Sequence, residues 1–189
     1  MPTESEKLGI EAQALGVSVV LGPGVNMKRS PLCGRNFNAS PKTRCSLGRS
    51  RLLDGRRNQS VGVGASVKRC GQQSGDRPHD GLGRNRRTRC VKLFPGVRAS
   101  GHPSQPWTVM CSYNRINGVY ASQDPWLLTT VLRDEWGFEG LVVSDWGAVD
   151  SRPAAVAAGL DLEMPSSVGS GAQKVLDALA SLGNLRRRR

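Results

Sequence analysis

The feature that most constrains the fold of this chain is a short apolar run that ends in a carboxylate. Residues 141–147 read Leu-Val-Val-Ser-Asp-Trp-Gly. An uninterrupted run of apolar and β-branched residues is typical of a strand whose two faces are both covered, as in a parallel sheet. The stretch therefore predicts a buried parallel strand that is followed directly by Asp145.

Strand-like and helix-like segments alternate on both sides of this stretch. The expected helices are residues 4–15, 125–136, 153–158 and 170–182. The expected strands are residues 17–21, 61–67, 107–112 and 141–144, with a strand-like piece at 160–164 and a turn-rich loop at 113–118. Alternation with short links predicts parallel strands and right-handed β/α connections. A closed barrel of this kind typically needs about 250 residues, so the 189 residues predict an α/β chain that forms an incomplete (β/α)8 TIM-type barrel.

The helix expected over residues 125–136 has the clearest signals. Asp124 is typical of an N-cap, Pro125 suits the first helical position, and Gly137 suits the end of the helix. One face of the helix is apolar and consists of Leu127, Leu128, Val131, Leu132 and Trp136.

The positive charge of the chain is confined to one internal stretch. Residues 38–105 hold 15 Lys and Arg against 3 Asp and Glu, which accounts for the whole net charge of +12, because the remainder has 12 of each. Within this stretch, residues 38–60 and 69–105 have neither helical nor strand periodicity. Segments of this composition cannot bury enough apolar surface to offset the entropy of ordering them. We therefore expect two irregular basic inserts.

These observations divide the chain into six parts. Barrel segments are expected at residues 1–37, 61–68 and 106–183, with the irregular stretches at 38–60 and 69–105 and a basic tail at 184–189.

Several classes of protein are disfavoured by composition. Five cysteines, an odd number without paired spacing, argue against a disulfide framework or a zinc site and fit a reducing compartment. Neither an apolar run of membrane-spanning length nor a signal peptide is visible. We therefore expect a cytoplasmic location, no membrane partner, no metal and no other cofactor.

The position of Asp145 indicates a chemical role. In a β/α barrel the active site is built from the C-terminal ends of the strands. A carboxylate at such an end, beside the indole of Trp146, suits nucleophilic attack on a sugar carbon. The alternative is that Asp145 caps the next helix or binds a loop amide.

Three stretches together resemble family 3 glycoside hydrolases, the β-glucosidase-like retaining enzymes. They are residues 21–37, 62–68 and 107–165. The third is the most specific, since it contains Val-Met-Cys-Ser-Tyr-Asn at 109–114 and Val-Val-Ser-Asp-Trp-Gly at 142–147. The resemblance is to the middle and end of the family's N-terminal barrel domain.

The resemblance implies a role for each candidate site residue. Asp145 matches the catalytic nucleophile, and Trp146 matches the aromatic residue that packs on the sugar. Arg35, Lys68 and Tyr113 match positions that hold sugar hydroxyls. The implied reaction is hydrolysis of terminal, non-reducing β-D-glucosyl or related residues with retention, so the implied partner is a carbohydrate substrate.

The sequence departs from the family pattern after Lys68. The family continues with His and then Asn-Asn-Gln-Glu-Thr-Asp-Arg, whereas this chain continues with Arg-Cys-Gly-Gln-Gln-Ser-Gly-Asp-Arg. Residues 70–84 can be written in codons that encode the family pattern when they are read one base later, and residues 40–47 behave similarly in another frame. We therefore interpret both basic stretches as out-of-frame translation, a hypothesis that the nucleotide sequence would test.

The general acid/base of the family commonly comes from a later domain. Asp161 and Glu163 are carboxylates downstream of Asp145, and neither matches that acid. Since loss of a general acid typically costs about 10²–10⁴-fold in rate, we expect the isolated chain to lack glycosidase activity. Two alternatives remain: a basic module that binds nucleic acid or another polyanion, and a remnant without function. The basic stretches have no zinc-finger spacing and no basic amphipathic helix, so we expect no specific nucleic acid.

Overall fold

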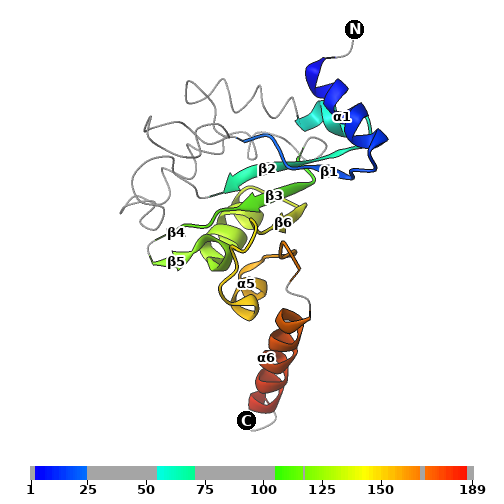
Figure 1. The fold of residues 1–189 in the computed structure, drawn as a ribbon. Helices are drawn as coiled ribbons and strands as arrows, with labels where there is room; N and C mark the ends of the chain where they lie inside the picture. The colour runs from blue at the N-terminus through cyan, green and yellow to red at the C-terminus, as the bar shows by residue number, and fades with distance from the viewer. Residues whose placement is uncertain (1–2, 25–54, 71–104, 117, 167–168, 187–189) are drawn as a thin grey trace.

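The centre of the molecule is a four-stranded parallel sheet. The computed structural model describes residues 3–24, 55–70, 105–116, 118–166 and 169–186 (Figure 1). The strands, in spatial order, are β1 (Val19–Val20), β2 (Gly64–Cys70), β3 (Thr108–Cys111) and β6 (Leu141–Val143). Every neighbouring pair in this order is parallel. The predicted parallel β/α arrangement is therefore confirmed for the described residues.

One face of the sheet forms the core. Val67, Val109 and Val142 are register partners on β2, β3 and β6, and each is at most 1% exposed. All three belong to one buried cluster with the apolar face of helix η4 (Trp126–Glu135). Because side chains alternate across a strand, the next row of register partners, Lys68, Met110 and Val143, is assigned to the opposite face.

Helix η4 forms where the sequence predicts a helix, but it begins one residue later, with Pro125 rather than Asp124 at the N-cap. The carboxylate of Asp124 accepts a hydrogen bond from the Trp126 amide at 3.1 Å, and its carbonyl accepts one from the Leu128 amide. The helix is wide, of the π type, and the Trp136 amide bonds to the Val131 carbonyl. It ends at Gly137, whose positive φ of 64° requires little energy only in glycine. The whole predicted apolar face is buried: Leu127, Leu128, Val131, Leu132 and Trp136.

Three further helices lie outside the sheet. Helix α1 (Glu4–Ala14) begins at a capping box in which Thr3 and Glu6 bond reciprocally. The hydrogen bonds from Thr3 hold the pKa of Glu6 below its ordinary value. Helix α5 (Arg152–Ala158) follows β6, and α6 (Ser170–Arg186) extends away from the sheet at the C-terminal side (Figure 1).

The structure differs from the sequence-based predictions in several places. Residues 55–60, predicted irregular, are helical. Strand β2 begins at Gly64 rather than Val61 and runs on to Cys70 rather than ending at Lys68. The predicted loop at 113–118 contains β4 (Arg115–Ile116), which pairs antiparallel with β5 (Val119–Tyr120) just after it. Helix α6 continues to Arg186, into the expected basic tail.

The helix at residues 55–60 packs against α1 by close approach rather than by an apolar face. Asn58 is only 5% exposed, and a Cβ added to Gly9 of α1 would lie 2.5 Å from a methyl group of Val61. The small residue lets the backbones approach closely, so Asn58 is buried although most of this helix is exposed. Residues 25–54 and 71–104 lie outside the described residues, and they include most of the stretches predicted to be irregular, 38–60 and 69–105.

Two smaller elements complete the fold. The short helix η3 (Ala121–Gln123) follows β5, and the predicted strand-like piece at 160–164 makes a parallel bridge between Leu162 and Val143. Among the helices that the structure describes, none has both the length and the apolar character needed to cross a membrane.

Candidate active site

Asp145 and Tyr113 lie at the same edge of the sheet. Each stands two positions beyond the end of its strand, Asp145 after β6 and Tyr113 after β3. Because β3 and β6 are parallel neighbours, their C-terminal ends meet at one edge. This is the edge at which β/α folds bind their ligands.

The Asp145 carboxylate is buried and fixed by hydrogen bonds. It is 3% exposed, and its Oδ1 accepts a bond from the Tyr113 hydroxyl at 3.0 Å. The same oxygen accepts a bond from the Trp146 amide at 2.9 Å. The latter contact confirms part of the alternative prediction, since Asp145 does bind a loop amide. The two bonds together set the direction in which the carboxylate faces.

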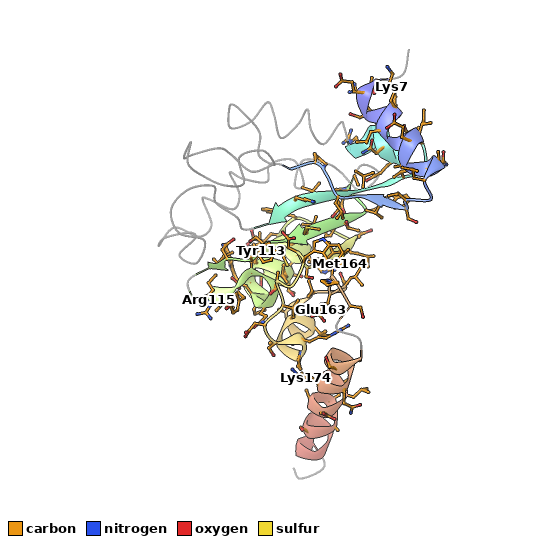
Figure 2. All side chains as sticks on the ribbon, viewed as in Figure 1. Lys7, Tyr113, Arg115, Glu163, Met164 and Lys174 are labelled. Atoms are coloured by element: carbon orange, nitrogen blue, oxygen red, sulfur yellow. The ribbon has the colours of Figure 1, made fainter. Side chains whose placement is uncertain are left out.

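The backbone on both sides of Asp145 is held by Met164. The amide of Met164 donates to Ser144 Oγ at 2.7 Å, and that hydroxyl donates to the Met164 carbonyl at 3.3 Å. The Gly147 amide donates to the same carbonyl at 3.0 Å. Tyr113 and Met164 come from different parts of the chain, and both are labelled in Figure 2. Sequence analysis did not identify Ser144 or Met164, and both occur within the stretches that carried the resemblance.

The other predicted site residues are Lys68, Trp146 and Arg35. Lys68 is in register with Met110 and, through it, with Val143, two residues before Asp145. The side chain of Trp146 is 53% exposed, as expected of a residue at the mouth of a site. Arg35 lies outside the described residues.

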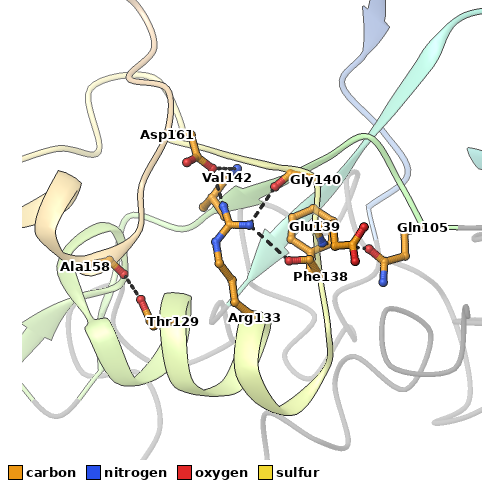
Figure 3. Close-up of polar contacts among 9 residues, drawn as sticks. All are labelled: Gln105, Thr129, Arg133, Phe138, Glu139, Gly140, Val142, Ala158 and Asp161. Carbon is orange, nitrogen blue, oxygen red and sulfur yellow. Dashed lines mark hydrogen bonds and ion pairs between the residues drawn. The ribbon is translucent and has the colours of Figure 1, made fainter. Parts of the chain in front are cut away.

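Asp161 and Glu163 are engaged in ion pairs. Asp161 pairs with Arg133 at 2.6 Å and accepts a bond from the Val142 amide at 2.7 Å (Figure 3). Glu163 pairs with Arg152 at 2.7 Å and is largely buried. These contacts give both carboxylates structural roles, and that neither is the general acid stays a prediction.

Cys111, the last residue of β3, is a neighbour of Asp145 that sequence analysis did not single out. It is fully buried, and burial raises the pKa of its thiol to about 12, with the negative charge of Asp145 acting in the same direction. At neutral pH the thiol is therefore protonated and unreactive. The part of the chain that the structure describes contains no group of three His, Cys, Asp or Glu side chains placed to hold a metal ion.

Comparison with known sequences identifies a family for most of the chain. Residues 3–188 match the model of the glycosyl hydrolase family 3 N-terminal domain. A thermostable β-glucosidase B of Acetivibrio thermocellus is 43% identical over 180 residues, which is 92% of this chain and 23% of that protein. An exo-α-(1→6)-L-arabinopyranosidase of Bifidobacterium breve is 48% identical over 153 residues, 80% of this chain and 20% of that protein.

Comparison with solved structures agrees with this result. A family 3 β-glucosidase of Bifidobacterium adolescentis superposes with a TM-score of 0.80 at 44% identity, covering 92% of this chain and 26% of that one. β-Glucosidase 3B of Thermotoga neapolitana in complex with α-D-glucose superposes with a TM-score of 0.83 at 36% identity, covering 94% and 26%. The chain therefore spans about a quarter of the length of the relatives it matches.

Proposed function

The chain belongs to glycosyl hydrolase family 3, and from that premise we propose that it carries the nucleophile of a retaining glycosidase. The observation that supports this most directly is the hydrogen bond between the Tyr113 hydroxyl and Asp145 Oδ1. The resemblance gives both residues a role toward the substrate, the carboxylate as nucleophile and the tyrosine as a ligand of a sugar hydroxyl. The hydrogen bond joins the two at the C-terminal edge of a parallel sheet. The proposed substrate is a terminal, non-reducing β-D-glucosyl or related residue.

In the proposed reaction the Asp145 carboxylate attacks the anomeric carbon of the sugar. A bond forms between a carboxylate oxygen and that carbon, and the bond from the carbon to the aglycone oxygen breaks. Water then hydrolyses the glycosyl-enzyme, so the configuration is retained overall. The bonds from Tyr113 and from the Trp146 amide hold the carboxylate at a fixed orientation, which lowers the entropic cost of the attack.

The remaining site residues are proposed to bind the sugar. Trp146 offers an exposed indole to the apolar face of the ring. Lys68 and Arg35 are proposed to donate charge-assisted hydrogen bonds to hydroxyl groups. Among the described residues, the carboxylates of Asp161 and Glu163 are occupied by Arg133 and Arg152, so we assign the general acid to neither.

The proposal is tested by trapping the glycosyl-enzyme on the full chain. A 2-deoxy-2-fluoro-β-D-glucoside with a dinitrophenolate leaving group needs no general acid for the first step. We expect one fluoroglucosyl adduct, located by peptide mass spectrometry on Asp145. Tyr113→Phe should slow labelling about tenfold, because a hydrogen bond to a charged group is lost. Hydrolysis of unactivated alkyl glucosides by the isolated chain is not expected.

Two variants serve as controls for the trapping experiment. Asp145→Asn should give no adduct, and Glu163→Gln should still be labelled, because Glu163 is held by Arg152. Absence of any adduct on the unmodified chain, or an adduct that persists in Asp145→Asn, would overturn the proposal.

A further inference from the structure

We propose that Ser144 is a positioning residue for the nucleophile, acting through its hydrogen bonds to the Met164 backbone. This inference rests on the proposed function and adds a residue to it. Ser144 does not reach the substrate in this role. It holds the peptide that carries Asp145.

The contacts of Ser144 extend a backbone pairing that is one bridge long. This bridge joins Val143 of β6 to Leu162 of the following strand-like piece, and the Ser144 amide donates to the Leu162 carbonyl at 2.9 Å. Beyond this point the Ser144 side chain makes the hydrogen bonds. Ser144 Oγ accepts from the Met164 amide at 2.7 Å and donates to the Met164 carbonyl at 3.3 Å.

The backbone is held by the Met164 carbonyl a second time, just after Asp145 and Trp146. The Gly147 amide donates to the Met164 carbonyl at 3.0 Å, and the Ala148 amide donates to the Asp145 carbonyl at 3.1 Å. Gly147 has a φ of 69°, which lets the chain turn back toward Met164 at little cost. The nucleophile thus lies between two points that are tied to one peptide group.

Burial makes the first of these anchors consequential. Ser144 is 0% exposed, and removing its hydroxyl would take away the acceptor of the Met164 amide. We infer that the loop would then shift at its N-terminal anchor while the bridge between Val143 and Leu162 stays intact. Displacements of about 1 Å at a reacting group cost about 10²-fold in rate.

The test compares four variants of the full chain by the kinetics of labelling with the same fluoroglucoside. Ser144→Ala removes the hydroxyl. Ser144→Thr and Ser144→Val form an isosteric pair that differs mainly in the hydroxyl. The matched control is Ser66→Ala, because Ser66 is equally buried on the same sheet but its hydroxyl has no hydrogen-bond partner among the described residues.

We expect the limiting rate of labelling to fall about 10- to 100-fold in Ser144→Ala and Ser144→Val, with the reagent concentration for half-maximal rate unchanged. Ser144→Thr should keep most of the rate, and Ser66→Ala should match the unmodified chain. Amide hydrogen exchange at Met164, measured far below the melting temperature, should accelerate at least tenfold in Ser144→Ala and Ser144→Val but not in Ser144→Thr or Ser66→Ala.

The outcomes separate this inference from the proposed function. If the unmodified chain is labelled at Asp145 and Ser144→Ala is labelled as fast, Ser144 has no positioning role and the proposed function stands. Equal loss in Ser144→Thr and Ser144→Val would likewise contradict a role for the hydroxyl. If the unmodified chain is not labelled, the proposed function fails, and this inference fails with it.

Discussion

Burial of the Cys111 thiol links the stability of the chain to alkaline pH. The pKa is raised from the ordinary 9.0 to about 12, chiefly by desolvation. Below pH 9 the thiol is protonated in both the folded and the unfolded chain, so its contribution to stability is fully present. Above pH 9 only the unfolded chain releases the proton, and the free energy of unfolding falls by up to about 1.4 kcal/mol per pH unit until the folded thiol ionises near pH 12.

Urea denaturation at pH 8, 9, 10 and 11 checks this expectation for the unmodified chain and for Cys111→Ala. Other groups also titrate in this range, so the informative quantity is the difference between the two pH dependences. The unmodified chain should lose more stability with rising pH than Cys111→Ala does. Parallel curves would show that the thiol ionises equally in both states.

At the scale of single residues, the sequence was informative where chemistry and position coincide. Asp145 and Tyr113 were both identified in advance, and the structure brings them within 3.0 Å. Ser144 was not identified, because a serine beside a strand carries no signal of its hydrogen-bond partners. Its role depends on Met164, a contact about twenty residues away that only the folded backbone reveals.

At the scale of elements, Arg133 joins helix η4 to the strand that leads to Asp145. Its guanidinium donates to the carbonyls of Phe138 and Gly140, each at 3.2 Å, and pairs with Asp161 (Figure 3). Asp161 in turn accepts from the Val142 amide of β6. The planar guanidinium therefore connects the helix, the following loop and both strand segments at once.

Replacing Arg133 by Met should lower the free energy of unfolding by about 1–3 kcal/mol, because two carbonyls and a carboxylate lose a charged donor. Arg133→Lys should recover only part of this loss, since an ammonium group cannot reproduce the fork. Arg115→Met is the control: that side chain is exposed, stacks on Tyr120, and should cost less than about 1 kcal/mol. Urea denaturation of the three variants measures the order, and equal losses for Arg133→Met and Arg115→Met would contradict the proposed connection.

Elements with strong local signals were the ones that the sequence predicted well. Helix η4 begins and ends within one residue of the predicted bounds, although Pro125 rather than Asp124 is at the N-cap. Asp124 accepts a hydrogen bond from the Trp126 amide, the predicted apolar face is buried, and Gly137 follows the helix with a positive φ. The hairpin of β4 and β5 was missed because strands of two residues are too short to show alternation. The helix at residues 55–60 was missed because its burial depends on Gly9 of another helix, which no local pattern reports.

At the scale of the whole molecule, the family and the parallel sheet are established, while the distribution of charge still calls for its own explanation. The family match spans residues 3–188 and so includes both basic stretches. Most of those stretches lies outside the described residues. The out-of-frame origin of the stretches therefore stays a prediction. The cytoplasmic location and the absence of a cofactor stay predictions as well.

The excess of 15 basic over 3 acidic residues in residues 38–105 predicts that the chain binds polyanions without selectivity. Binding that depends on counterion release weakens steeply with salt, with a logarithmic slope of about −0.9 for each phosphate contacted. We expect the chain to bind duplexes of unrelated sequence with equal affinity at low salt and to release them as salt rises. Fluorescence anisotropy over a salt series measures both the affinity and the slope.

Neutralising a basic cluster within that stretch separates this composition effect from a dedicated nucleic-acid site. Replacing Arg84, Arg86, Arg87 and Arg89 by Gln should make the slope shallower by up to about 4, because each lost charge removes at most one phosphate contact. The control replaces two exposed lysines outside the stretch, Lys7 and Lys174, by Gln and should change the slope less. If the chain prefers one duplex sequence and keeps this preference after the four replacements, the basic residues would be explained by a dedicated nucleic-acid-binding module. The explanation as a composition effect within a glycosidase fragment would then be wrong.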